Sequence, residues 1–103
     1  MAKVLGFNPS RPFSNATATE RIRTLWMDGQ YVASPYAEMR MEQRDFSDGD
    51  VAFLIMNYTV RSHRKENGLW RYKISGKSVD GKPMAAVFEI DGNFMTLVTV
   101  HER

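Results

Sequence analysis

The sequence predicts an α+β fold in which about three N-terminal helices pack on a four-stranded antiparallel meander sheet. Helix start signals lie in the first half of the chain, and the hydrophobic period changes to two after about residue 58. Three turn dipeptides separate the apolar runs that follow. Since 103 residues provide for one core, we expect a single α+β domain over residues 17–103 and an extended N-terminal arm over residues 1–16.

The arm is expected because the first residues are rich in Pro, Ser and Asn, with isolated phenylalanines such as Phe13 that could contact the body. Thr17 and Glu20 have the spacing of a capping box, and apolar residues follow them at helical spacing. Gly29 is a stop signal for this first helix. Residues 31–33 are too short a run to assign, and we expect a linker there.

Two further helices are predicted before the strands. Ser34 followed by Pro35 is typical of a helix start, because serine caps the first turn and proline has no N–H to satisfy there. This helix should run to about Arg44. Ser47 and Asp50, three residues apart, indicate the start of the third helix.

Four strands are predicted in the second half, joined by tight turns. The turn dipeptides are Asn67-Gly68, Asp80-Gly81 and Asp91-Gly92. Residues 84–90 and 94–100 are apolar on both faces, which favours central strands covered on both sides or a homodimer contact through the C-terminal strands.

The basic charge of the chain is concentrated in the first predicted hairpin. Residues 61–77 contain six Lys or Arg and one Glu, a local charge of +5, whereas the whole chain carries +2. An anionic partner is therefore expected at this hairpin. The alternative is that the cations only protect a solvent-facing strand from aggregation.

Alternation along the hairpin predicts which side chains share a face. If Tyr72 faces the helices, Arg71 and Lys73 point away from them, and Arg61 and His63 are expected to join them from the neighbouring strand. Guanidinium and ammonium groups bind phosphate oxygens, and histidine can transfer protons near neutral pH. This chemistry is sufficient for metal-free RNA cleavage, with His101 as a second proton carrier.

Other chemistries have little support. The chain has no cysteine, which excludes disulfides, thiolate metal sites and cysteine nucleophiles. The two histidines lack the spacing of a zinc site, and no phosphate-binding glycine loop is present, so we expect no cofactor and no metal. No apolar run is long enough for a membrane span or a signal peptide, and we expect a cytoplasmic location without membrane contact.

One segment, residues 34–51, resembles the signature S-x-H-A-x-x-R-M-x-x-R-x-[I/F]-S-x-x-D-V of a small bacterial domain-of-unknown-function family. That family is grouped with the RelE/ParE-like toxins and the wider barnase–EndoU–colicin–RelE ribonuclease fold. The matching residues are Ser34, Ala37, Arg40, Met41, Arg44, Ser47, Asp50 and Val51. The run 99–101 resembles the closing strand of the family, so that the resemblance covers roughly residues 20–101.

The resemblance implies a toxin-like protein of a toxin–antitoxin pair that binds or cleaves mRNA, on the ribosome in some relatives, and that a partner antitoxin neutralises. If the chain is an enzyme, it should be a metal-independent ribonuclease; ParE-type relatives inhibit gyrase without cleaving anything. Tyr36 stands at the histidine of the signature, which favours the alternative of a non-catalytic protein-binding or regulatory module on a degenerate toxin fold. A third interpretation is an α+β protein whose basic hairpin is only a solvated edge.

These arguments lead to two groups of candidate residues. The candidate catalytic residues are Tyr36, Arg61, His63 and His101. The candidate nucleic-acid-binding residues are Arg40, Arg44, Lys65, Arg71 and Lys73.

Overall fold

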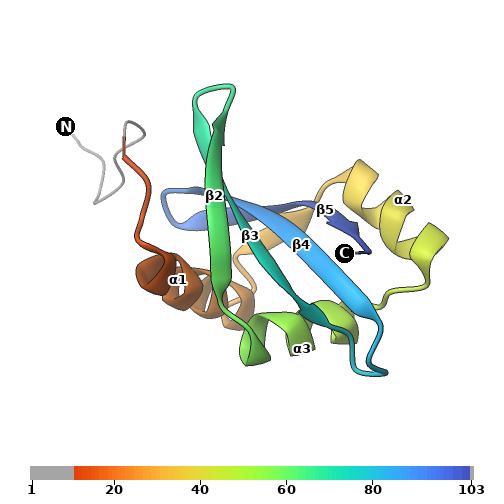
Figure 1. Cartoon of the computed structure of the whole chain (residues 1–103). Coiled ribbons are helices and arrows are strands. Elements are labelled where there is room, and N and C mark those ends of the chain that lie inside the picture. The colour runs from red at the N-terminus through yellow and green to blue at the C-terminus, as the bar shows by residue number, and fades with distance from the viewer. Residues whose placement is uncertain (1–10, 103) are drawn as a thin grey trace.

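The computed structural model describes residues 11–102 and has the predicted α+β class, with helices first and most strands afterwards (Figure 1). The helices are α1 (Asn15–Met27), α2 (Pro35–Arg44) and α3 (Asp48–Asn57). The strands are β1 (Tyr31–Ala33), β2 (Val60–Glu66), β3 (Leu69–Lys77), β4 (Pro83–Asp91) and β5 (Phe94–His101). No helix within residues 11–102 has the length and apolar character needed to cross a membrane.

The sheet has five strands in the order β1-β5-β4-β3-β2, so the prediction of four antiparallel strands was wrong in detail. The four predicted strands form the antiparallel meander, and β1 adds a short parallel strand at the edge beside β5. We expected a linker at β1, because three residues show no periodicity. Its partner strand lies more than 60 residues further along the chain, with Tyr31 opposite Met95.

The first helix begins earlier than predicted. Ser14 is the N-cap, its hydroxyl accepting a hydrogen bond from the amide of Thr17 at 3.1 Å, so Thr17 lies inside the helix and does not form the predicted capping box with Glu20. The last two residues of the predicted arm therefore belong to α1, and residues 1–10 lie outside the described part of the chain. Phe13 contacts the body as expected, because its amide donates to the hydroxyl of Tyr72 at 2.9 Å.

The starts of α2 and α3 agree with the predictions. Ser34 caps α2 with Pro35 in the first turn, and Ser47 and Asp50 form a reciprocal capping box at α3. Asp50 also accepts a hydrogen bond from the amide of Val79 at 3.1 Å, which ties α3 to the loop between β3 and β4.

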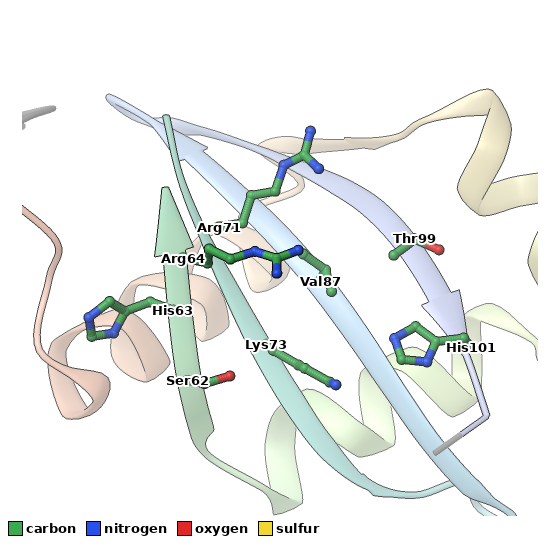
Figure 2. Close-up of a pocket in the computed structure, with 8 residues that line it drawn as sticks. All are labelled: Ser62, His63, Arg64, Arg71, Lys73, Val87, Thr99 and His101. Atoms are coloured by element: carbon green, nitrogen blue, oxygen red, sulfur yellow. The ribbon is translucent and has the colours of Figure 1, made fainter. Parts of the chain in front are cut away.

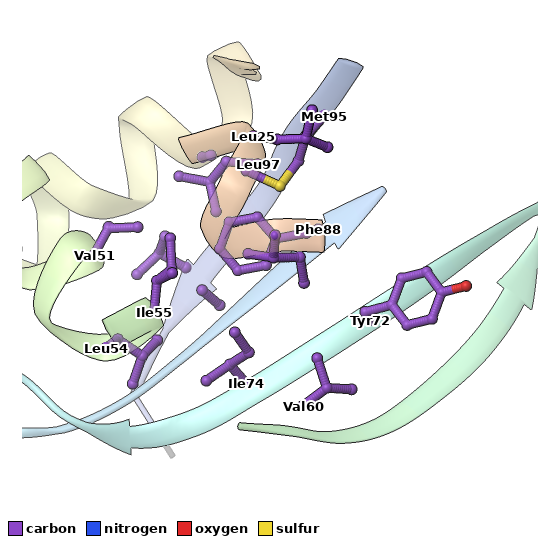
Figure 3. Close-up of a cluster of buried hydrophobic side chains, with 14 of the residues drawn as sticks. Leu25, Val51, Leu54, Ile55, Val60, Tyr72, Ile74, Phe88, Met95 and Leu97 are labelled. Carbon is purple, nitrogen blue, oxygen red and sulfur yellow. The ribbon is translucent and has the colours of Figure 1, made fainter. Parts of the chain in front are cut away.

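The three helices and the inner face of the sheet share one hydrophobic core (Figure 3). Tyr72, Ile74 and Phe88 are fully buried in this core, as the alternation along the strands predicted for the hairpin. Burial raises the pKa of Tyr72 above its usual range, although the hydrogen bond from the Phe13 amide acts in the opposite direction.

The helices cover one face of the sheet, and the other face is open in the described chain (Figures 1 and 3). The prediction that β4 and β5 are central strands is correct, but helices cover them on one side only. The turn of the β2–β3 hairpin projects beyond the helices (Figure 1). Asn67 and Gly68 both have positive φ, of 52° and 84°, as a two-residue hairpin turn requires.

Candidate functional site

A pocket of about 480 Å³ lies on the open face of the sheet, across β2, β3, β4 and β5 (Figure 2). All but one of its lining residues are of polar or basic type, and Val87 is the exception. The lining residues are Ser62, His63, Arg64, Arg71, Lys73, Val87, Thr99 and His101. The pocket therefore brings together four of the nine candidate residues: Arg71, Lys73 and His101 on the open face, and His63 at its border.

Strand register places Lys73 and His101 on opposite sides of the pocket. Lys73 on β3 lies opposite Val87 on β4, and Val87 lies opposite Thr99 on β5, two residues before His101. The side chains of Lys73 and His101 point toward each other over Val87 (Figure 2). Within the described residues, no acidic side chain forms an ion pair with Lys73.

The hydrogen bonding of His101 determines which ring nitrogen is available. Nδ1 lies 3.0 Å from the carbonyl oxygen of Glu102. Because a carbonyl can only accept, this contact is a hydrogen bond in the tautomer that carries its hydrogen on Nδ1, and in that neutral ring Nε2 is the unprotonated nitrogen. His101 can therefore accept a proton through Nε2 while its backbone contact holds the ring.

The two arginines of the pocket are engaged by carboxylates. Arg71 Nε lies 2.7 Å from Glu89 Oε2 on β4, and Arg71 Nη1 lies 3.3 Å from Glu66 Oε1 on β2. The other oxygen of Glu66 lies 2.9 Å from Arg64 Nη2. Arg64 and Arg71 are direct cross-strand neighbours, so Glu66 also offsets the repulsion between them.

His63 does not share the open face with Arg71 and Lys73, and that prediction was wrong. It lies opposite the buried Tyr72, and its ring packs edge-on against Trp70 at 5.4 Å between centroids. Its Nδ1 lies 3.3 Å from Oδ1 of Asn15 at the start of α1. His63 borders the pocket, but its ring points away from Lys73 (Figure 2).

A register shift at Arg61 explains why His63 does not lie on the open face. Val60 faces the core opposite Ile74, but the strand is irregular between Val60 and Ser62, so the alternation counted outward from Val60 is offset by one residue. Ser62 instead faces the pocket opposite Lys73. Arg61 is exposed at the shift, and its carbonyl accepts a hydrogen bond from the side-chain amide of Asn15 at 3.5 Å.

Lys65 lies outside the pocket. It is opposite Trp70 near the tip of the hairpin, with its ammonium nitrogen 5.9 Å from the centroid of the indole ring. A cation in this position can stabilise the exposed hairpin by contact with the ring face.

The three candidate residues on α2 form a separate group. The guanidinium of Arg40 lies 6.0 Å from the ring centroid of Tyr36, and the Tyr36 ring is 52% exposed. Arg44 forms a loose ion pair of 3.9 Å with Glu102, next to His101. Arg44 is therefore connected to the end of β5, where His101 lines the pocket.

Arg64 is a pocket residue that the candidate list omitted, although the sequence held a signal for it. In a hairpin with a two-residue turn at Asn67-Gly68, counting outward pairs Arg64 with Arg71 and Ser62 with Lys73. The turn therefore predicts the residues of the open face, whereas alternation from the start of β2 does not, because of the shift at Arg61.

Comparison with known proteins supports the general part of the resemblance. Curated proteins and solved structures give no match to the chain. Residues 34–102 match the family model described as "Domain of unknown function (DUF4258)", and the match begins at Ser34, the first residue of the signature. It includes α2, α3 and the last four strands. Because this match covers more than half of the chain, the protein belongs to the DUF4258 family, a family of domains of unknown function.

Proposed function

We propose that the protein is a RelE/ParE-like toxin that binds single-stranded RNA on the open face of the sheet and cleaves it without a metal ion. The observation that carries the proposal is the placement of Lys73 and His101 on opposite sides of one pocket, with Nε2 of His101 free to accept a proton. The signature on α2 and the membership of a domain-of-unknown-function family are consistent with it.

The proposed reaction uses these two side chains. Nε2 of His101 accepts the proton of a 2′-hydroxyl, O2′ attacks the adjacent phosphorus, and the bond from phosphorus to O5′ breaks. The products are a 2′,3′-cyclic phosphate and a 5′-hydroxyl, whose oxygen takes its proton from water. The ammonium group of Lys73 offsets the negative charge that develops on the phosphoryl oxygens.

The proposed function also implies binding partners for the protein. A toxin of this kind would act on mRNA, with the ribosome as one place of action, and a partner antitoxin would cover the pocket. A homodimer through the C-terminal strands would use their open face, because β4 lies between β3 and β5, and β1 pairs with residues 95–97 of β5.

The test uses the full chain and a fluorescent single-stranded RNA, with a DNA of the same sequence as control. Anisotropy measures binding, and a denaturing gel run after incubation in EDTA measures cleavage. We expect His101→Ala to lower the cleavage rate by about 10²–10⁴-fold while binding changes little. Lys73→Gln should weaken binding and reduce the slope of log K against log salt by about 0.7, the value for one phosphate contact on a single strand.

Lys77→Gln is the matched control, since Lys77 is an exposed lysine of the same strand that does not line the pocket. If Lys77→Gln and Lys73→Gln weaken binding equally, the pocket is not the binding site. The ribonuclease proposal is wrong if the wild-type chain produces no new RNA ends in EDTA.

A second candidate function is a non-catalytic protein-binding or regulatory module. It is supported by Tyr36 at the signature histidine and by His63, whose ring points away from the pocket, which leaves one histidine at the site. Capture of a neighbouring-gene product by the wild-type chain, together with unchanged capture by Lys73→Gln and His101→Ala and no RNA cleavage, would favour this function.

A further inference from the structure

The two halves of the pocket differ in the availability of their cations. Lys73 has no acidic partner among the described residues, whereas Arg64 and Arg71 both contact carboxylates. The guanidinium N–H groups of Arg64 and Arg71 are the donors that a phosphate would need. A polyanion that spans the pocket must therefore compete with side chains of the protein itself.

The carboxylates of Glu89 and Glu66 differ in their exposure and in their contacts with the arginines. Glu89 is 19% exposed and lies 2.7 Å from Arg71 Nε, a short contact with a partly buried group. Glu66 is 34% exposed, its oxygens are shared between two arginines, and its partner Arg64 is 80% exposed. Ion pairs with such exposure contribute little stability, so the Glu66 contacts are the ones that a ligand can replace.

We propose that Glu66 is an internal competitor that occupies the phosphate-binding positions of Arg64 and Arg71 until a polyanion displaces it. Glu89 keeps its contact with Nε and orients the Arg71 guanidinium, while Nη1 and the Arg64 fork become available to phosphate oxygens. This regulation rests on the proposed function insofar as the polyanion is RNA. Competition by Glu66 would then set the affinity of the open face for the polyanion.

The experiment is a binding series with Glu66→Gln, which removes the charge and retains the shape of the side chain. Since Arg64 and part of Arg71 become available, we expect RNA binding to tighten by about three- to tenfold. The slope of log K against log salt should steepen by about 0.7–1.4, the value for one to two additional phosphate contacts on a single strand. Melting temperatures of all variants establish that the fold is retained.

Two further variants separate competition from a general change of charge. Glu20→Gln removes one negative charge from an exposed position of α1, and this helix packs on the other face of the sheet. It should change the affinity much less than Glu66→Gln does. The double variant Arg64→Ala/Glu66→Gln should lose the part of the gain that Arg64 contributes, because only Arg71 Nη1 is then released from Glu66.

Equal affinities of Glu66→Gln and Glu20→Gln would overturn the inference, and so would a gain of undiminished size in the double variant. Inorganic polyphosphate as a second probe distinguishes this failure from failure of the proposed function. If no variant binds RNA but Glu66→Gln binds polyphosphate more tightly than wild type, the competitor role stands and the RNA proposal is wrong. If the wild type binds RNA and Glu66→Gln binds both probes no more tightly, the competitor role alone is wrong.

Discussion

Asp50 joins two parts of the fold, and its removal should have a large and pH-dependent effect on stability. Its carboxylate accepts hydrogen bonds from the amide of Ser47 at 2.9 Å, the hydroxyl of Ser47 at 3.2 Å and the amide of Val79 at 3.1 Å. The residue is only 9% exposed. Asp50→Ala would therefore remove the α3 capping box and also leave the Val79 amide without its acceptor.

The expected loss in the free energy of unfolding for Asp50→Ala follows from these contacts. Ser47 still caps α3 through its hydroxyl, so loss of the hydrogen bonds from Ser47 to the carboxylate costs about 1 kcal/mol, and loss of the Val79 hydrogen bond to a charged acceptor costs about 1.5 kcal/mol. We therefore expect the free energy of unfolding to fall by about 2–3 kcal/mol for Asp50→Ala. For a domain of this size the melting temperature should decrease by roughly 10–20 °C.

The pH dependence gives a second, independent prediction. Burial raises the pKa of Asp50, but the hydrogen bonds from Ser47 and Val79 and the charge of Lys82 outweigh it, so the net pKa lies below its usual value. The folded state then binds the proton more weakly than the unfolded state, and the charged carboxylate stabilises the fold at pH values above the unfolded pKa. This stabilisation is lost as the pH falls through the folded pKa.

Urea denaturation at pH 7 and near pH 3 measures both effects. The difference between wild type and Asp50→Asn, which loses the charge, should be largest at pH 7 and shrink toward pH 3. Asp48→Ala is the control, because Asp48 is an exposed carboxylate of the same helical turn. The reasoning is refuted if Asp50→Ala costs no more than Asp48→Ala, or if the Asp50→Asn difference is the same at both pH values.

Two other substitutions test close packing and helix capping. A Cβ at Gly76 would lie 2.4–2.6 Å from ring atoms of Tyr58, so Gly76→Ala should lower the free energy of unfolding by about 1–3 kcal/mol in urea denaturation. Gly49→Ala is its control and should not destabilise, since the added Cβ would meet only a hydroxyl at 3.5 Å. The Lys82 ammonium donates to the carbonyl of Arg44 at 3.0 Å at the end of α2, and Lys82→Met should cost about 0.5–1 kcal/mol, less at high salt. A loss independent of salt would show that the charge of Lys82 is not responsible.

The parts of the fold that could be predicted were those with local signals. Ser34-Pro35 and the Ser47–Asp50 pair specify helix starts through hydrogen bonds within one turn, and both starts are confirmed. Asn67-Gly68 specifies its hairpin because both residues accept positive φ. The start of α1 was misplaced because Ser14 and Thr17 are both acceptable caps, and local sequence does not choose between them.

The candidate site could be predicted only where its residues also depend on local signals. Arg71 and Lys73 share a face because alternation within one strand is a local property, and the structure places both in the pocket. His63 was assigned to the wrong face because one irregularity at Arg61 changes the face of the residues beyond it. His101 enters the pocket through pairing with distant strands.

Local signals in the sequence specify the α+β class, the order of helices and meander strands, and the concentration of basic charge in the first hairpin. These properties depend on periodicity, caps and turns, which act over a few residues. Only the tertiary structure decided that β1 joins the sheet, that His63 faces α1, and that Glu66 and Glu89 engage the arginines of the open face. Such features arise between segments far apart in the chain, where packing and register select partners that no local signal specifies.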